Sequence, residues 1–279
     1  MRNFTFKGLF LAVVFIVLGS LSIQAADDGL ITRQVTIKLE KAGTLPNKIG
    51  STKKFQITNL KIIGEINGTD LRMIREMAGK DARGNDTDGM LSVLDLSDAK
   101  IVEGKGYYMG NSYSTSNDKI GDLAFEGCSG LTSLTLPTGV TKIGYDAFSG
   151  CSGLTSLTLP SGVTEIGYSA FSGCSGLTSI YVYAEKMPKL GTDMFNGCDA
   201  KKCTVYVPKG TYDDYWLSEF GYFENIVEFD PTGINNVITS NDAKELSRYS
   251  LNGQRLSAPT KGLNIVKYSD GSVKKVAVQ

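Results

Sequence analysis

The chain has 279 residues, 41% of them hydrophobic, which is enough for one large or two modest globular domains. Its 29 lysines and arginines balance 29 aspartates and glutamates, so the composition argues against a nucleic-acid partner. The sequence has no histidine, which excludes His-dependent catalytic triads and removes the commonest zinc ligand.

The amino terminus has the pattern of a secretory signal peptide. Arg2 and Lys7 flank the start of an apolar run over residues 8–21, and small residues follow at Ala25 and Ala26. The run is shorter than the roughly 20 residues of a membrane-spanning helix, and no cysteine marks a lipid anchor. We predict a signal peptide over residues 1–25 and no transmembrane segment in the mature chain. A final location at the cell surface, outside the cell or in the periplasm stays open.

Residues 26–89 are predicted to form an amino-terminal capping region. RQVTIKLEK and KFQITNLKIIG have the alternating apolar pattern of strands. Thr69 is predicted to cap a helix over DLRMIREMAG that ends at Gly79. Such a region would cover the amino-terminal end of the domain that follows it.

Residues 90–228 contain a repeat. FEGCSGLTSLTLPTGVTKIGYDA and FSGCSGLTSLTLPSGVTEIGYSA follow one another and share 19 of 23 positions, and two less regular copies come after them. Leu131, Leu134 and Leu136 follow a Leu-x-x-Leu-x-Leu pattern, and a period of 23 falls in the range of leucine-rich repeats. A single coil of this length cannot bury its apolar face alone, so the repeats predict a stacked solenoid. Gly144 and Gly167 are expected to permit the turn in each coil.

An earlier coil is visible in MLSVLDLSDAKIV, and GKGYYMGNSYSTSND separates it from the regular repeats. The glycines of this segment lack the Gly-Lys-Ser/Thr sequence of a phosphate-binding loop. A surface insertion is therefore the prediction for it.

The last repeat is followed by a second cap and a small module. Thr211 is predicted to cap a helix over YDDYWLSEF, with Gly221 beyond its end, and NIVEF is a closing strand. Residues 229–245 are predicted to be a linker. Residues 246–279 contain Asn-Gly and Asp-Gly turn signals and are predicted to form a small module of β-hairpins.

Four cysteines recur with the repeat: Cys128, Cys151, Cys174 and Cys198. Their spacing makes them equivalent positions in successive coils, and a buried ladder of free thiols is the main interpretation. Zinc would need short paired spacings that are absent, and thiol catalysis would lack an activating histidine. Whether Cys198 forms a disulfide with Cys203 stays open.

Residues 90–228 resemble the BspA-like leucine-rich-repeat family of bacterial surface proteins. LTSLTLPSGVTEIGYSAFSGCSG and CTVYVPKG carry the resemblance, since proline follows the strand where many other leucine-rich repeats have asparagine or cysteine. The resemblance implies a right-handed solenoid used for adhesion, with some members binding host extracellular-matrix proteins or other bacteria. The expected fold is thus a leucine-rich-repeat right-handed solenoid with short capping helices and a small carboxyl-terminal β module.

The outward positions of the repeat strands are the only interaction surface that the sequence predicts. Stacked in register, these positions change from hydroxylated to aromatic toward the carboxyl end. The predicted concave binding face consists of Ser133, Thr135, Ser156, Thr158, Ser179, Tyr181, Tyr183 and Tyr206. Tyrosine gives large contact area at low entropic cost, which favours a binding role. The alternative is that β-propensity and packing beneath the cap selected the tyrosines.

We therefore expect an exported, non-enzymatic binding protein without cofactor or metal, which mediates adhesion or protein-protein interaction at the bacterial cell surface. No pair of carboxylates is singled out by spacing, as a glycosidase would require. The expected partner is a protein or a host extracellular-matrix component. A surface glycan-binding protein for nutrient capture is the alternative.

Overall fold

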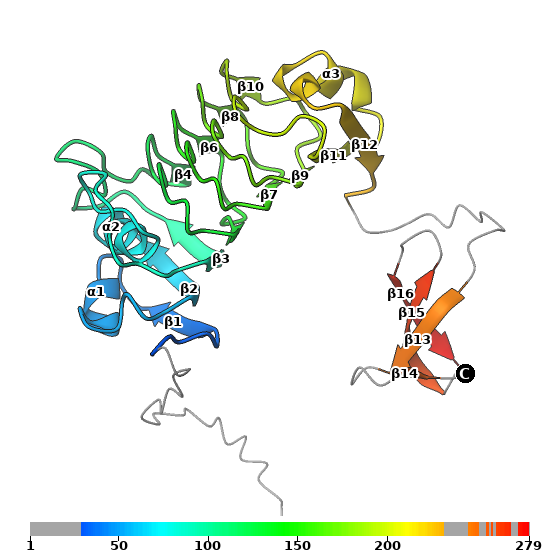
Figure 1. The fold of residues 1–279 in the computed structure, drawn as a ribbon, viewed down its shortest axis with the longest axis horizontal. Helices are drawn as coiled ribbons and strands as arrows, with labels where there is room; N and C mark the ends of the chain where they lie inside the picture. The colour runs from blue at the N-terminus through cyan, green and yellow to red at the C-terminus, as the bar shows by residue number, and fades with distance from the viewer. Residues whose placement is uncertain are drawn as a thin grey trace, which may run out of the picture. The chain divides into compact units, whose positions relative to one another are not determined.

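The computed structural model describes residues 29–231 and, near the carboxyl terminus, residues 245–250, 255–256, 258, 261–268 and 273–278. The predicted signal peptide over residues 1–25 lies outside the described residues. The chain divides into two compact units, Met1–Pro231 and Thr232–Gln279 (Figure 1).

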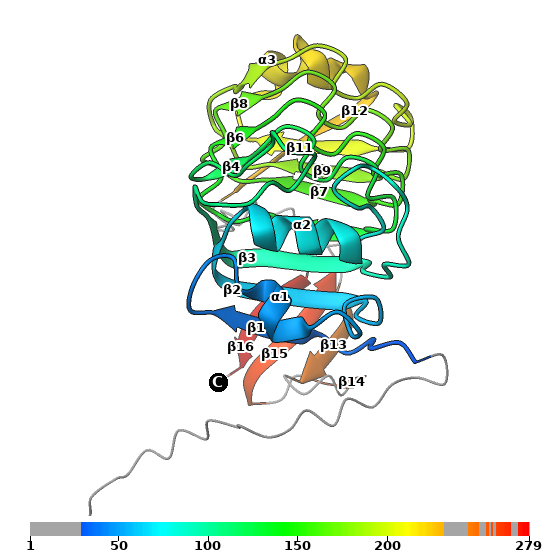
Figure 2. The same ribbon diagram turned by 90° about the vertical axis from the view of Figure 1, so that its left-hand side faces the viewer.

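In its described part, the first unit is a stack of coils that builds two parallel sheets (Figures 1 and 2). The larger sheet has eight strands in the order β1-β2-β3-β5-β7-β9-β11-β12. These strands are Val35–Leu39 (β1), Asn59–Ile66 (β2), Val93–Ile101 (β3), Ser133–Thr135 (β5), Ser156–Leu159 (β7), Ser179–Val182 (β9), Thr204–Pro208 (β11) and Asn225–Phe229 (β12). The smaller sheet consists of Lys119–Ile120 (β4), Lys142–Ile143 (β6), Glu165–Ile166 (β8) and Lys189–Leu190 (β10). This is the predicted leucine-rich-repeat solenoid, in which each regular coil adds one strand to each sheet.

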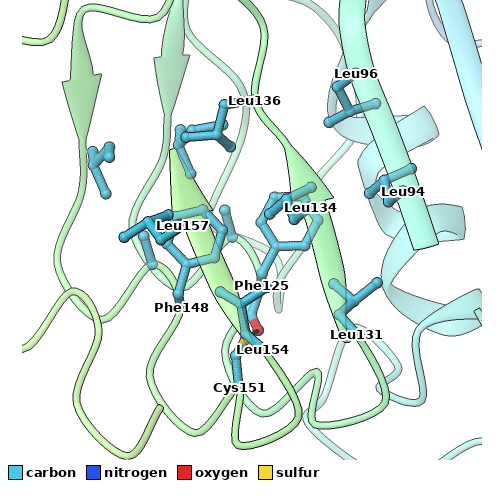
Figure 3. Packing of buried hydrophobic residues seen from close by; sticks show 14 of the residues in the cluster. Leu94, Leu96, Phe125, Leu131, Leu134, Leu136, Phe148, Cys151, Leu154 and Leu157 are labelled. Carbon is cyan, nitrogen blue, oxygen red and sulfur yellow. Dashed lines mark hydrogen bonds between the residues drawn. The ribbon is translucent and has the colours of Figure 1, made fainter. Parts of the chain in front are cut away.

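The core is a set of side-chain ladders that run from coil to coil. Leu94, Leu134 and Leu157 lie on successive strands of the large sheet and point into the same interior (Figure 3). Phe125 and Phe148 stack at a ring distance of 5.4 Å, and the ladder continues at 5.5 and 5.8 Å through Phe171 and Phe195. Because each ring contacts the ring of the next coil, a coil gains its stability from its neighbours, as the repeat predicted.

The left-handed backbone of the turn in each coil does not lie at the glycines for which the turn was predicted. Gly144 and Gly167 do not have positive φ; a Cβ at Gly144 would lie 2.6 Å from the backbone nitrogen of Asp122 in the preceding coil. These glycines therefore allow close approach of coils, and the prediction that they serve the turn is wrong. The left-handed backbone lies two residues later, at Asp146 and Ser169, with φ of 48° and 51°.

The amino-terminal cap contains two helices, Leu45–Ile49 (α1) and Gly68–Met77 (α2). The N-cap of α2 is Asn67 and not Thr69, so that prediction is wrong by two positions. The Asn67 side chain accepts a hydrogen bond from the Thr69 backbone, and Asp70 accepts one from the Asn67 backbone at 3.0 Å. Asp70 also accepts from the backbone of Leu45 at 2.9 Å, which ties α1 to α2.

The carboxyl-terminal cap has a short helix Tyr212–Trp216 (α3) and a 3-10 helix Glu219–Tyr222 (η1) where one longer helix was expected. Thr211 makes no side-chain capping bond; its hydroxyl donates to the Pro208 carbonyl at 2.6 Å. Glu228 of β12 accepts from the Tyr212 backbone at 3.1 Å instead. The predicted role of Thr211 as a side-chain cap is therefore wrong, because a residue from the closing strand takes it.

The second unit contains a four-stranded antiparallel sheet in the order β14-β13-β15-β16. Its strands are Glu245–Ser250 (β13), Arg255–Leu256 (β14), Gly262–Tyr268 (β15) and Val273–Val278 (β16). This is the small carboxyl-terminal β module expected from the turn signals. Buried Arg248 donates to the Asn264 side chain at 3.2 Å, which joins its two central strands.

Candidate binding surface

The outward side chains of the large sheet form one continuous surface, which we call the strand face. The register pairs Ser133 with Ser156, Ser156 with Ser179, and Ser179 with Thr204. Neighbouring strands of a sheet lie about 4.8 Å apart, so equivalent residues form straight columns. The structure thus places the hydroxylated residues of the predicted face in the expected register.

Hydroxyl groups occupy the middle of the strand face. Ser179 donates from its hydroxyl to the hydroxyl of Ser156 at 3.0 Å. Thr158 stands beside Tyr181 in the adjacent column, and Thr135 beside Asp95. These small side chains leave the backbone close to the surface, so this part of the face is smooth and polar.

The carboxyl-terminal part of the strand face is an aromatic cluster, made by Tyr181, Tyr183, Tyr206 and Phe229. The rings of Tyr181 and Tyr206 stack at 4.5 Å and an interplanar angle of 6°. Phe229 lies edge-on to Tyr183 at 5.2 Å and to Tyr181 at 6.3 Å. All four side chains are partly exposed. Burial and the neighbouring tyrosines raise the pKa of Tyr181, so its hydroxyl is a neutral donor and acceptor at physiological pH.

Phe229 belongs to this cluster although the sequence reasoning missed it. The signal was present, since NIVEF alternates and β12 pairs with β11 in parallel, Val227 beside Tyr206. Continuing the repeat columns into the closing strand would have placed Asn225, Val227 and Phe229 on the same face.

The opposite end of the strand face is charged, and the ion pairs that Lys61 makes there were not predicted from the sequence. Lys61 of β2 lies 2.9 Å from Asp95 and 2.7 Å from Asp98. Partial burial acts to raise the pKa of Asp95, but hydrogen bonds from Ser97 and Lys61 outweigh it and hold that pKa below its usual range. The face therefore changes from an ion-paired end through a hydroxylated middle to the aromatic cluster.

Other exposed aromatic side chains lie away from the strand face. Tyr145 and Tyr168 stack at 5.8 Å next to the small sheet and are 44% and 47% exposed. Tyr212 and Trp216 stack at 6.1 Å on α3. Stacked tyrosines thus occur on both sides of the coils, so stacking alone does not mark the binding surface.

The repeated cysteines point into the core and form no disulfide, and Cys203 is likewise buried and free. The thiol of Cys151 donates to the Phe125 carbonyl at 3.1 Å, and that of Cys174 donates to the Phe148 carbonyl at 3.2 Å. Burial raises the pKa of Cys128 to about 11. A buried, protonated thiol is a poor nucleophile, and a bond between Cys198 and Cys203 is not present. Within the described ranges, no three Cys, Asp or Glu side chains are grouped so that they could hold a metal ion.

Part of the chain is similar to known leucine-rich-repeat proteins. The model of the BspA type leucine-rich-repeat region matches residues 111–215 in six copies. No curated protein matches the chain. A solved leucine-rich repeat protein from Bacteroides ovatus ATCC 8483 is 27% identical, with a TM-score of 0.35, over 50% of this chain and 40% of that one. The match thus spans less than half of that protein. Residues 111–215 of this chain are thus similar to the BspA type leucine-rich-repeat region.

Proposed function

We propose that this protein is an exported, non-enzymatic binding protein that holds a protein partner on the strand face and mediates adhesion at the bacterial cell surface. The observation that carries the proposal is the aromatic cluster: four partly exposed rings gathered at the carboxyl-terminal end of the strand face, next to its hydroxylated middle. Clustered tyrosines are typical anchors of protein interfaces because they bury much area with few rotatable bonds.

The scaffold supports this function. The strands β9 and β11 each pair with a neighbour on both sides, and β12 pairs with β11. The aromatic cluster is therefore held in place before binding, and little ordering entropy is lost on association. Leucine-rich repeats are typically scaffolds for interaction and not for catalysis. Export is proposed from the signal-peptide pattern of residues 1–25. No helix within the described ranges is long and apolar enough to cross a membrane.

Ring geometry favours a protein over a glycan as the partner. Tyr181 and Tyr206 cover one face of each other's ring, and Phe229 directs its contacts at Tyr181 and Tyr183. The outward-facing ring edges of these tyrosines can pack against side chains of a protein partner. Their hydroxyl groups can form hydrogen bonds with its peptide backbone.

The proposal is tested by presenting the mature chain in parallel to purified extracellular-matrix proteins, to bacterial surface proteins and to a glycan array. Binding to one or more proteins, saturable and at least about tenfold tighter than to serum albumin, is the expected result. Binding to glycans with no protein bound would support the alternative of nutrient capture and contradict the proposal.

A further inference from the structure

The two ends of the solenoid carry opposite charge. The amino-terminal segment 29–57, which contains β1 and α1, has six basic residues and one acidic residue. The segment 209–231, which follows β11 and contains α3, η1 and β12, has one basic residue and six acidic ones. The net charges are therefore +5 and −5, although the whole chain is neutral.

These charges lie at the two extremes of one stack. β1 pairs with β2 at one end of the large sheet and β12 pairs with β11 at the other. In Figure 2 the first unit runs from β1 and α1 at one end to β12 and α3 at the other. Most of the charged side chains are exposed, including Lys48 and Lys53 at the first end and Asp213 and Asp214 at the second.

Both ends also leave apolar surface incompletely covered. Val35 and Ile37 face the core side of β1, yet they are only partly buried because no described coil follows on that side. At the other end Trp216, Leu217 and Val227 are 45%, 84% and 45% exposed. Solenoid ends normally present a polar outer face, so exposed apolar side chains of this size indicate a contact surface.

Charged side chains at the edge of a sheet usually prevent association with another strand. If both ends of the solenoid carried charge of the same sign, two copies would repel each other in every orientation. Here the signs differ. Two amino-terminal ends repel each other, two carboxyl-terminal ends repel each other, and only an amino-terminal end and a carboxyl-terminal end attract. Because the strands of the sheet are parallel, this orientation also lets the sheet of one copy follow the sheet of the next in the same direction.

We propose that the protein self-associates head to tail, the acidic end of one copy binding the basic end of a second copy. This contact joins two different surfaces, so it is heterologous, and it produces open chains of copies that grow with concentration. Val227 and Phe229 of the acidic end also belong to the strand face. The charged residues that the test changes, Lys48, Lys53, Asp213 and Asp214, lie outside the strand face, so the two proposals can fail separately.

The test measures the average mass of the mature chain by sedimentation over a concentration series. Self-association is expected at about 0.01 M salt, where the Debye length is about 30 Å, and should be lost at about 1 M salt, where it is about 3 Å. A chain that stays monomeric at low salt and high concentration overturns the proposal and leaves the charged ends to other partners.

Charge reversal identifies the surfaces. The carboxyl-end variant Asp213→Lys/Asp214→Lys and the amino-end variant Lys48→Glu/Lys53→Glu should each associate at least tenfold more weakly than the parent chain. The substitutions change the net charge of the carboxyl-terminal end from −5 to −1 and that of the amino-terminal end from +5 to +1. An equal mixture of the two variants should regain pairwise association, because the unaltered carboxyl-terminal end of one variant meets the unaltered amino-terminal end of the other. Association that is unchanged in either double variant, or not restored by mixing, overturns the proposal.

Milder substitutions test whether misfolding, and not the change of charge, weakens association in the charge-reversal variants. Asp213→Asn/Asp214→Asn and Lys48→Gln/Lys53→Gln remove charge without reversing it and should weaken association by a smaller factor, with the thermal midpoint of the parent. If these neutral variants melt normally and associate like the parent, charge does not drive the contact and the proposal fails.

Discussion

The guanidinium of Arg75, fully buried in α2, donates to the carbonyl of Leu123 at 2.7 Å, 48 residues along the chain. It also donates to the Ala124 carbonyl at 3.0 Å. Leu123 has a φ of 60°, which turns its carbonyl inward at the start of the first regular coil. The amino-terminal cap is therefore fastened to the repeats through a buried cation that binds backbone carbonyls.

Replacing Arg75 should weaken the contact between the amino-terminal cap and the first regular coil. Arg75→Ala removes the side-chain donor to the Ala124 carbonyl, leaves the Leu123 carbonyl with the Glu126 backbone donor, and creates a cavity. We therefore expect a loss of about 3 kcal/mol in the free energy of unfolding in urea. Arg72→Ala on the same helix, where the side chain is exposed, should cost less than about 0.5 kcal/mol. A loss below about 1 kcal/mol for Arg75→Ala would show that the buried cation is not an important fastening.

The left-handed turn residues give a second prediction. Asp193 has a φ of 58° and accepts a hydrogen bond from the Asn196 side chain at 3.0 Å. Asp193→Val should lower the free energy of unfolding by about 1–2 kcal/mol, because a β-branched residue is strained in this conformation. Asp193→Asn, which tolerates it, should change stability by less than about 0.5 kcal/mol. Equal effects of the two substitutions would contradict the strain argument.

The thiol ladder predicts how stability depends on pH. Burial raises the pKa of Cys128 and Cys198 to about 11 and that of Cys203 to about 12, from an ordinary value of 9.0. Below pH 9 these thiols are protonated in both the folded and the unfolded chain, so they add no pH dependence. Above it the unfolded chain loses protons that the folded chain keeps, and stability should fall by up to about 1.4 kcal/mol per pH unit for each thiol.

Urea unfolding midpoints at neutral pH and near pH 10 measure this fall. Cys203→Ala should show a shallower decline than the parent because one thiol fewer is involved. In the native state at neutral pH the thiols should also react slowly with an aromatic disulfide reagent. A midpoint that does not change up to pH 10 would contradict the burial of protonated thiols.

The regular part of the fold could be predicted because a constant period fixes the register. Once Ser133 and Ser156 are known to be equivalent, their pairing, the core leucines and the buried cysteines follow from the alternation of a strand. Contacts outside the repeat could not be predicted in this way. Arg75 finds its carbonyls only after the cap has docked on the first coil, and no local pattern marks that contact.

The caps show the same limit. Asn67 and Thr69 are both good capping residues two positions apart, and Asp70 decides between them because it also accepts a hydrogen bond from the Leu45 backbone of α1. At the other end, Glu228 from β12 takes the role that the sequence suggested for Thr211. In both places a hydrogen bond to a neighbouring element, α1 or β12, helps to fix the helix start, and local helix propensity does not predict such a bond.

The central claim is that the aromatic cluster anchors the partner. Tyr181→Thr/Tyr206→Thr introduces the residue type that Thr158 supplies in the preceding coil, so the coils should remain stacked. The matched control is Tyr145→Thr/Tyr168→Thr, which removes an equally stacked pair beside the small sheet.

The deciding measurement is the dissociation constant of a partner from the binding screen for these two variants and the parent chain, with thermal midpoints recorded alongside. The strand-face variant should melt like the parent and bind at least tenfold more weakly, which corresponds to about 1.4 kcal/mol, while the control binds as the parent does. If the strand-face variant binds unchanged and the control variant loses binding, the partner uses the side of the small sheet and the central claim is wrong.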